Sequence, residues 1–368
     1  MRVAMVCPYS LSRPGGVQGQ VQGLARALRD LGHQVAVVAP DDRGRPGPAG
    51  PDAYRIGRPA AVRSNGSVAP VSLSPLAPVR ARQFARRYRA DVVHLHEPLA
   101  PLAGYGCLVA GPAPVVGTYH RSGDSRAYEL LGPLARWANA RMAVRCAVSE
   151  AAADTARVAL GGDYEVLFNG VEVERFAGAR PWPTEGPTVL FLGRHEQRKG
   201  LAVLLDAFTS VPGPAVLWVA GDGPETAALR GRHPASDRVR WLGVLDDAEV
   251  ASRLAGAQVL CAPSLGGESF GMVLLEGMAA GCTVVASDIA GYRAAAGGHA
   301  VLVPPGEPAA LGTALAAALA DTGPGADAAR RAALGHAEQW SMGHLATRYV
   351  AVYERAIGAR AIGARAVR

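Results

Sequence analysis

Two carboxylates, Glu268 and Glu276, stand eight residues apart in the segment 264–288. Glu268 lies in a glycine-containing loop after an apolar strand. Glu276 lies about two turns into the helix expected next, which Ser269 would cap, given roughly 3.6 residues per turn. The glycines leave backbone N–H groups uncovered at the helix start, where an anion or sugar hydroxyl groups can approach. We therefore predict an anionic, polyhydroxylated ligand such as a nucleotide sugar. Two solvated acids in an ordinary βαβ unit are the alternative.

A second candidate site is the loop 193–200, which carries Arg194 and Lys199. Lys199 is the only lysine among 38 basic residues, which indicates that the planar fork of an arginine would not serve at this position. Two cations on one loop between a strand and a helix can bind a diphosphate and neutralise it as it leaves, without a protein base. A solvated basic loop is the alternative.

The amino-terminal segment contains a candidate phosphate-binding turn. An apolar strand at 3–7 leads into a turn with Gly15 and Gly16, and an amphipathic helix follows at 17–31. Such turns bind phosphate through bare N–H groups, although they are common in α/β proteins. His120 follows another apolar strand, at the edge where open α/β sheets bind their ligands.

The spacing of histidines and cysteines does not favour a metal site. His94, His96 and His120 lie near strand ends, but neither an HxxxH pattern nor paired cysteines accompany them. The five cysteines are scattered and odd in number, so we expect reduced, buried thiols.

A basic stretch at 75–89 has five arginines within ten residues and no acid, beside Leu76, Val79, Phe84 and Tyr88. One interpretation is a solvated helix face. The other is an amphipathic helix on an anionic membrane, where each cation contributes about 1 kcal/mol. Nucleic acid is not expected as a partner, because no recognition motif accompanies the charge. The candidate membrane residues are Arg80, Arg82, Arg86, Arg87 and Arg89.

The elements that must position these residues alternate between strands and helices, which predicts an α/β protein with doubly wound sheets. At 368 residues, with 49% hydrophobic and 19% charged side chains, two globular domains are expected. We place them at 1–176 and 177–344, with a crossover helix and a disordered basic tail at 345–368. No apolar run approaches the roughly 18 residues of a membrane span and no room precedes the first strand for a signal peptide, which favours the cytoplasm.

Charge is unevenly divided along the chain. Residues 1–180 contain 22 basic and 14 acidic side chains, a net charge of +8, and the remainder has 16 and 17, a net charge of −1. The first half is therefore expected to meet an anionic partner.

Four well-spaced motifs that span nearly the whole chain resemble those of the retaining family 4 glycosyltransferases. They are the P-G-G turn, N-G-V at 169–171, G-R-x(3)-R-K-G from Gly193, and E-S-F-G-x(4)-E from Glu268. The resemblance implies the GT-B fold, in which two Rossmann-like domains face each other across a cleft. It also implies an enzyme that uses a nucleotide-diphosphate sugar and needs neither a cofactor nor an essential metal.

The resemblance also implies roles for individual residues. The expected catalytic residues are His120, Arg194, Lys199 and Glu268. The expected donor-binding residues are Gly15, Gly16, Arg194, Lys199, Leu245, Glu268, Ser269, Phe270, Gly271 and Glu276. The expected acceptor-binding residues are Tyr9, Gln18, Asn65, His120 and Arg121. Thr118 and Tyr119 are expected to border the reacting sugar.

Several stretches are most similar to the members of the family that transfer mannose from GDP-mannose to phosphatidylinositol at the inner face of the cell membrane. These are the first ten residues, N-G-S-V-A, H-x-H-E-P and L-G-G-E-S-F-G. The loop after His120 departs from that pattern, and its Asp124 would repel an inositol phosphate. Two alternatives therefore stay open: a soluble family 4 enzyme acting on a small metabolite such as an inositol phosphate or a natural product, and a non-catalytic lipid- or nucleotide-binding protein. GDP and UDP both stay open as the donor nucleotide.

Overall fold

The computed structural model describes residues 1–12, 15–42, 47–48, 52–64, 67–100, 102–121, 132–268 and 270–366. The chain forms two compact units, one made of Met1–Gly170 with Met342–Arg368 and the other of Val171–Ser341. These divisions fall six and three residues before the boundaries placed from the sequence.

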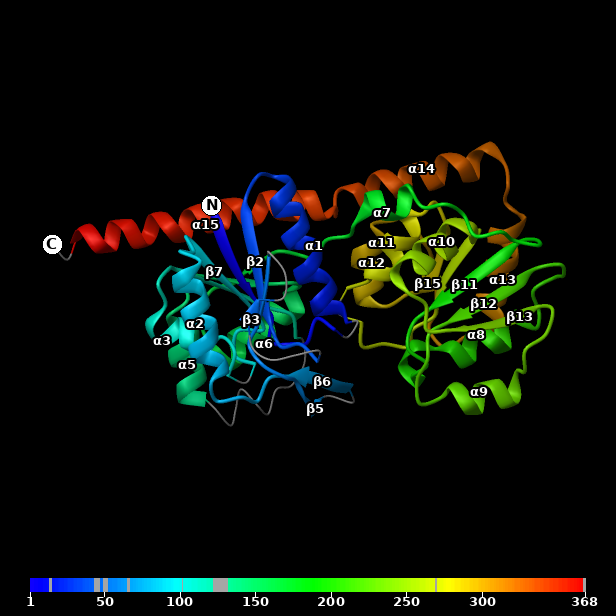
Figure 1. The fold of residues 1–368 in the computed structure, drawn as a ribbon. Helices are drawn as coiled ribbons and strands as arrows, with labels where there is room; N and C mark the ends of the chain where they lie inside the picture. Colours follow the sequence, from blue (N-terminus) through cyan, green and yellow to red (C-terminus); the bar gives the residue numbers. More distant parts are fainter. Residues whose placement is uncertain are drawn as a thin grey trace. The chain divides into compact units, whose positions relative to one another are not determined.

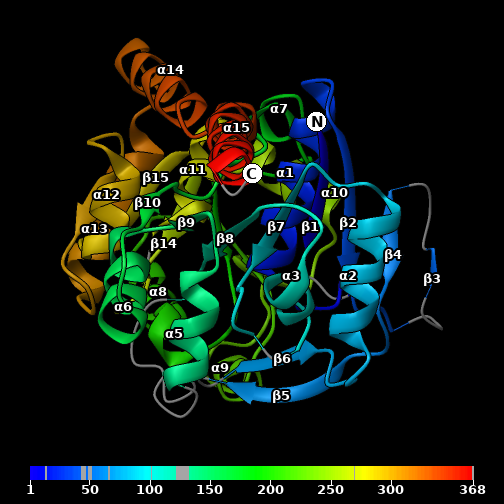
Figure 2. The ribbon, with the colours of Figure 1, turned by 90° about the vertical axis from the view of Figure 1, so that its left-hand side faces the viewer.

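The described part of the first unit (Figure 1) is built on a sheet with the strand order β10-β9-β8-β7-β1-β2-β4-β3, whose strands are all labelled in Figure 2. Neighbouring strands are parallel except for β3 and β4. A separate antiparallel pair is formed by β5 (Ala60–Ser64) and β6 (Ser67–Val71). The sheet strands are β1 (Arg2–Val6), β2 (Gln34–Ala39), β3 (Gly47–Pro48), β4 (Ala53–Arg55), β7 (Val92–His96), β8 (Val115–Tyr119), β9 (Val144–Ala147) and β10 (Glu165–Val166).

Helices cover both faces of this sheet, as Figure 2 shows. One face packs against α1 (Gly16–Asp30) and α15 (Met342–Ala366), and the side chains of β1 and β7 that point there are buried. The other face packs against the remaining helices, whose inward positions are mostly alanine. These are α2 (Ala77–Arg87), α3 (Tyr105–Ala110), α5 (Gly132–Ala140) and α6 (Glu150–Leu160).

The second unit has a parallel sheet with the order β13-β12-β11-β14-β15-β16. Its strands are β11 (Thr188–Leu192), β12 (Val216–Ala220), β13 (Val239–Gly243), β14 (Val259–Ala262), β15 (Thr283–Ser287) and β16 (Val301–Val303). Its helices are α7 (Val173–Ala177), α8 (Leu201–Phe208), α9 (Thr226–Arg232), α10 (Asp247–Gly256), α11 (Met272–Ala279), α12 (Ala290–Ala296), α13 (Pro308–Ala320) and α14 (Pro324–Glu338).

Numbered along the chain, both sheets follow the doubly wound order 3-2-1-4-5-6, and the first unit adds a further strand at each edge, β3 beside β4 and β10 beside β9. The order reverses between β1 and β7 in the first unit and between β11 and β14 in the second. Sheets of this kind bind ligands beyond the carboxyl ends of the strands at that reversal. The fold therefore predicts one candidate site in each unit.

One expectation about a helix end was wrong: α15 continues through the repeated A-I-G-A-R segment as far as Ala366, where a disordered tail was expected. Good helix formers in that repeat explain the continuation. The residue directly before α11 is Gly271, and Ser269, which was predicted to cap that helix, lies outside the described residues.

All five cysteines are buried and free, which confirms the prediction of unpaired thiols. Within the described ranges, no helix is both long enough and apolar enough to cross a bilayer.

Candidate functional site

The reversal point of the second unit brings together the two motifs that carry its charged residues. β11 and β14 pair directly, and the loops that follow their carboxyl ends lie against each other. The peptide N–H of Leu265 donates to the carbonyl oxygen of Arg198 at 2.7 Å. Gly200 has φ 69°, and a Cβ atom added there would lie 1.9 Å from the carbonyl oxygen of Pro263. Only glycine fits such a close approach in the left-handed region.

Glu268 is the centre of a partly exposed ion-pair cluster at this point. Its Oε1 lies 2.7 Å from Nζ of Lys199 and 2.9 Å from Nη1 of Arg198. The hydroxyl of Ser264 approaches the same oxygen at 3.4 Å. Oε2 of Glu268 forms no hydrogen bond with any residue that the structure describes, which leaves it available to accept hydrogen bonds from ligand hydroxyl groups.

A second carboxylate, Glu196, joins the remaining cation to this cluster. Its two oxygens lie 3.0 Å from Nε of Arg194 and 3.0 Å from Nε of Arg198. The three cations therefore face two carboxylates, and one positive charge is left for an anionic ligand. The side chain of Arg194 is 54% exposed and can reach such a ligand.

Arg198 is a site residue that we did not predict. It joins both carboxylates, and the sequence contained a signal for it because it stands directly before Lys199 in the R-K-G motif. Its role depends on two loops that are 70 residues apart in the chain.

The side chains of Ser264 and Tyr292 support the loop that carries Glu268. The hydroxyl groups of Ser264 and Tyr292 are hydrogen-bonded at 2.8 Å, and both residues are buried. Burial raises the pKa of Tyr292, and the negative charge of Glu268 raises it further, so the phenol stays protonated. Gly291 permits the close approach of α12, since a Cβ atom there would lie 2.2 Å from the carbonyl oxygen of Glu268.

Glu276 lies on α11 and its carboxylate forms no hydrogen bond with the part of the chain that the structure describes. Burial raises its pKa to about 7; the charge of Arg175 opposes that shift, and Asp247 and Glu172 add to it. Of the other predicted donor residues, Phe270 has its ring buried against Trp340, with centroids 4.9 Å apart. Leu245 is half-buried in the loop after β13.

Gly271 directly precedes α11 and has no side chain that could cap the helix. A Cβ atom at this position would lie 2.9 Å from Ala295 and 3.0 Å from Tyr292. The tight packing of α12 therefore explains the glycine.

The reversal point of the first unit carries the glycine turn. Gly15 precedes α1, has no side chain to cap the helix, and is exposed together with Gly16. A Cβ atom at Gly15 would lie 2.5 Å from Oε1 of Gln18, so the glycine leaves room for that buried amide. Gln18 in turn donates to the carbonyl oxygen of Ser10 at 3.3 Å. The start of α1 is a helix amino terminus of the kind that can bind an anion through its N–H groups.

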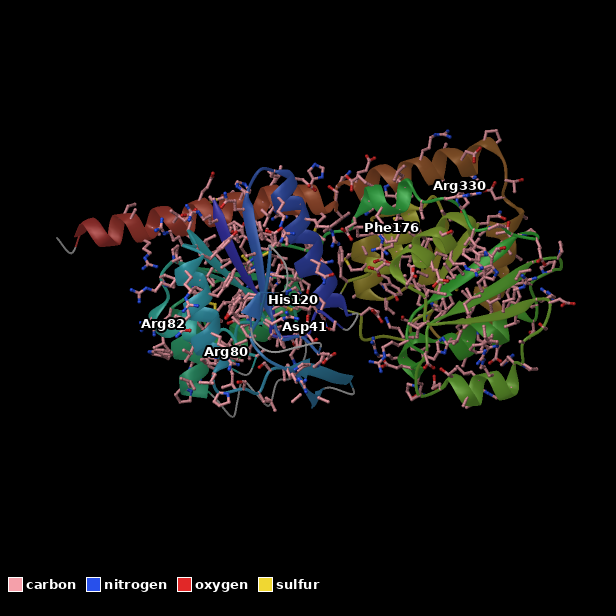
Figure 3. The ribbon with its side chains drawn as sticks, viewed as in Figure 1. Asp41, Arg80, Arg82, His120, Phe176 and Arg330 are labelled. Carbon is pink, nitrogen blue, oxygen red and sulfur yellow. The ribbon has the colours of Figure 1, made fainter. Side chains whose placement is uncertain are left out.

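His120 lies at the carboxyl end of β8 and is labelled in Figure 3. Its backbone N–H donates to Oε1 of Glu97 at 2.6 Å. Burial raises the pKa of Glu97 to about 7, although the His120 N–H and the charge of Arg121 oppose the shift. Burial also lowers the pKa of His120 to about 4, so its imidazole is neutral at pH 7.

Tyr9, Glu97 and Arg121 are in electrostatic contact. Burial raises the pKa of Tyr9, the charge of Glu97 raises it further, and Arg121 lowers it. The predicted acceptor residues Tyr9, His120 and Arg121 are therefore brought together in the first unit. Asn65 and Asp124 lie outside the described residues.

Thr118 and Tyr119 were expected to border the reacting sugar, but their hydroxyl groups form hydrogen bonds within the protein. The hydroxyl of Thr118 is 2.7 Å from Nε2 of His94. The hydroxyl of Tyr119 donates to Asn139 at 2.8 Å from a fully buried ring. The expectation for Tyr119 was wrong, because alternate residues of a strand face opposite sides of the sheet and its ring points into the α5 and α6 side.

The basic helix is α2, and it differs from the expectation in two ways. Nη1 of Arg80 donates to the carbonyl oxygen of Ile56 at 2.9 Å. Arg80 and its neighbour Arg82 on α2 are labelled in Figure 3. Phe84 and Tyr88 stack inward, 5.4 Å apart, against the core of the unit. Arg80 therefore helps to hold the fold, and the two aromatic rings are not part of the exposed face.

The exposed face of α2 and the residues before it combines cations with apolar side chains. Among the described residues none of these cations forms an ion pair. We call this set the α2 face: Leu73, Leu76, Val79, Arg82, Arg86, Arg87 and Arg89.

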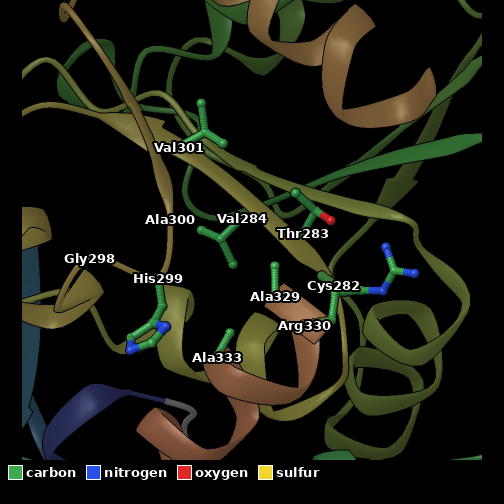
Figure 4. Close-up of a pocket in the computed structure, with 10 residues that line it drawn as sticks. All are labelled: Cys282, Thr283, Val284, Gly298, His299, Ala300, Val301, Ala329, Arg330 and Ala333. Atoms are coloured by element: carbon green, nitrogen blue, oxygen red, sulfur yellow. The ribbon is translucent and has the colours of Figure 1, made fainter. Parts of the chain in front are cut away.

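A pocket of about 230 Å³ lies elsewhere in the second unit (Figure 4). It is lined by the first residues of β15 and β16, Thr283 and Val301, and by Arg330 of α14. It therefore opens at the amino ends of the strands, opposite the edge that carries Glu268. No group of three residues suited to hold a metal is found in the described ranges.

Two Rossmann-like units, each with a glycine-rich or charged loop at its reversal point, define the fold as GT-B. The Anabaena protein Alr3699/HepE, solved in complex with UDP and glucose, has the same fold: the TM-score is 0.72 at 18% identity, over 96% of this chain and 99% of that one. A family model described as Glycosyltransferase Family 4 matches residues 14–175, and one described as Glycosyl transferases group 1 matches residues 186–321.

Similarity to curated proteins extends over the whole chain. The phosphatidyl-myo-inositol mannosyltransferase of Mycolicibacterium smegmatis is 39% identical over 98% of this chain and 95% of its own length. The protein of the same name from Mycobacterium leprae is 38% identical over 96% of both chains. The chain belongs to the family 4 glycosyltransferases and is an enzyme of that class, as the sequence motifs predicted.

Proposed function

We propose that the protein transfers mannose from GDP-mannose to phosphatidylinositol, with retention of the anomeric configuration, on the inner face of a membrane. Binding of the sugar donor is supported by one observation: Lys199 and Arg198 both contact Glu268 at the reversal point of the second sheet. The names of the two mycobacterial relatives support mannose as the sugar and phosphatidylinositol as the acceptor.

In the proposed reaction the bond between C1 of mannose and the β-phosphate oxygen breaks, and its electron pair leaves with the diphosphate. Arg194 and Lys199 stabilise this developing charge. An inositol hydroxyl oxygen forms the new bond to C1, and its proton passes to the released phosphate oxygen. No metal or cofactor is needed for this step, since the arginine and lysine side chains supply the positive charge.

The other donor contacts belong to the same proposal. Oε2 of Glu268 accepts hydrogen bonds from sugar hydroxyl groups, and Glu276 accepts from the ribose. N–H groups at the start of α11 bind phosphate oxygens. The Gly15–Gly16 turn at the start of α1 is the candidate phosphate site of the first unit. Main-chain atoms near Leu245 contact the nucleobase.

The α2 face is the proposed contact with the membrane. Leu73, Leu76 and Val79 are each about half exposed beside arginines that form no ion pair with the described residues, an arrangement that suits the headgroup region of an anionic bilayer. Four exposed arginines at about 1 kcal/mol each give a binding energy that salt would weaken.

The test is transfer from GDP-mannose, with UDP-mannose and UDP-glucose as controls, to phosphatidylinositol in vesicles and to soluble inositol phosphate. We expect a mannosylated lipid from GDP-mannose, and loss of this product in Lys199→Ala. Transfer only to the soluble acceptor would identify a small-metabolite enzyme instead. No turnover of any donor, with nucleotide binding intact, would indicate a non-catalytic protein.

A further inference from the structure

Two neutral imidazoles share a hydrogen bond in the first unit, at the predicted binding site for the sugar acceptor. Nδ1 of His96, the last residue of β7, lies 2.9 Å from Nε2 of His120. The ring of His96 is buried, with 3% of its surface exposed. Burial lowers the pKa of both histidines, so each ring carries one proton at pH 7. One proton therefore lies between the rings, and it belongs to one of them.

The second nitrogen of His96 shows which ring owns that proton. Nε2 of His96 is fully buried and has no hydrogen-bond partner among the described residues. If His120 donated, His96 would carry its proton on Nε2, as a buried N–H without an acceptor. If His96 donates from Nδ1, only a lone pair is left bare at Nε2. Orphaned buried N–H groups are rarer in proteins than acceptors with an unused lone pair.

We infer that His96 is a positioning residue that donates its Nδ1–H to Nε2 of His120 and so fixes His120 in the Nδ1–H tautomer. His120 then presents a hydrogen-bond donor, not a base, at Nδ1, which forms no hydrogen bond with the described residues. Its only lone pair, on Nε2, is occupied by His96. The placing of His120 beside the acceptor rests on the proposed function, whereas its tautomer does not.

A buried network holds His96 in this orientation. Its ring lies against that of His94, with centroids 4.1 Å apart. His94 is fixed at both nitrogens, by the hydroxyl of Tyr353 at 2.8 Å and that of Thr118 at 2.7 Å. Thr118 also meets the hydroxyl of Tyr349 at 2.9 Å. Both tyrosines belong to α15, so the carboxyl-terminal helix supports the histidine pair.

The direct test is nitrogen NMR of the whole protein with ¹⁵N-labelled histidine, recorded at pH 7 without substrate. The His120 signals are assigned by their loss in His120→Asn. We expect His120 to show a protonated Nδ1 and an unprotonated Nε2, with the same pattern for His96. A protonated Nε2 on His120, or a charged ring at pH 7, would overturn the inference. This measurement needs no turnover, so it is independent of the proposed reaction.

Two variants test the consequence for catalysis. The amide of Asn can take the place of Nδ1–H, so His96→Asn should keep transfer to phosphatidylinositol within about threefold of the wild type. His96→Leu removes the donor and should lower kcat by about tenfold, the equivalent of one hydrogen bond. It should also give His120 a mixture of tautomers in the NMR spectrum. Equal loss in both variants with an unchanged His120 spectrum would show that His96 supports the fold only.

Discussion

Lys199 shows at the scale of a single residue why a lysine is kept in a chain that otherwise uses arginine. Its ammonium lies 2.7 Å from Glu268 and shares that carboxylate oxygen with Arg198. A planar guanidinium at this position would be larger than the compact charge and would compete with Arg198 for the same oxygen. The local packing therefore selects the ammonium.

We expect Lys199→Arg to lower kcat/KM for donor turnover by roughly tenfold to a hundredfold, because the charge stays but its position shifts. The midpoint of thermal unfolding should change by only a few degrees. Arg331→Lys, an exposed change on α14, is the control and should leave both quantities unchanged. Turnover at the wild-type rate in Lys199→Arg would contradict the role given to the single lysine.

Glu276 gives a prediction about pH. Its pKa is about 7 in the folded protein and near 4.3 in an unfolded chain. Between these values the folded state binds more protons, so the free energy of unfolding should fall as the pH rises through this window. Glu276→Gln removes the titration. It should be more stable than the wild type in denaturant at pH 8, with the difference vanishing below about pH 4, and should bind GDP more weakly. A parallel pH profile for the two proteins would refute this.

At the scale of an element, two glycines differ in the space around the position where a Cβ atom would lie. Gly200 is held between the Lys199 turn and α8, with no room for a Cβ beside Pro263. Gly335, in the last turn of α14, has nothing within 4 Å of its Cβ position. The same substitution should therefore have opposite effects in the two elements.

Gly200→Ala should lose at least about 1–2 kcal/mol of unfolding free energy from its left-handed backbone alone, and donor binding should weaken as the loop moves. Gly335→Ala should gain about 0.5–1 kcal/mol, because alanine favours a helix. Denaturant unfolding measures both. Destabilisation by Gly335→Ala equal to that of Gly200→Ala would contradict the packing described for the loop.

The α2 helix separates arginines that face solvent from one that holds the fold. Changing Arg82, Arg86 and Arg87 together to Ser should weaken binding to anionic vesicles several-fold or more, most clearly at low salt, while hydrolysis of the soluble donor persists. Arg80→Ser should instead reduce stability by about 1–3 kcal/mol, because it removes a charged donor from the carbonyl of Ile56. Equal loss of vesicle binding and donor hydrolysis in the triple variant would mean that the α2 face supports the fold.

At the scale of the whole molecule, the sequence allowed prediction of the fold class and of which loops carry charge. Hydrophobic strands, glycine turns and helix periods are local, and the doubly wound order places the ends of particular strands together. Contacts between distant segments were not predictable in this way. Arg198 bridges two loops, and Tyr353 forms a hydrogen bond with His94 across 259 residues of sequence. Phe84 packs against the core of its unit, whereas the sequence had suggested an apolar side chain on the membrane-facing side of α2.

In the proposed reaction, the Lys199–Glu268 cluster of the second unit activates GDP-mannose for transfer to phosphatidylinositol. The most direct measurement is mass and NMR analysis of the lipid formed from GDP-mannose and phosphatidylinositol vesicles by the wild type and by Lys199→Ala. We predict one α-linked mannose on the inositol ring with the wild type and none with the variant. A β-linked product, or a wild-type level of product from Lys199→Ala, would contradict it.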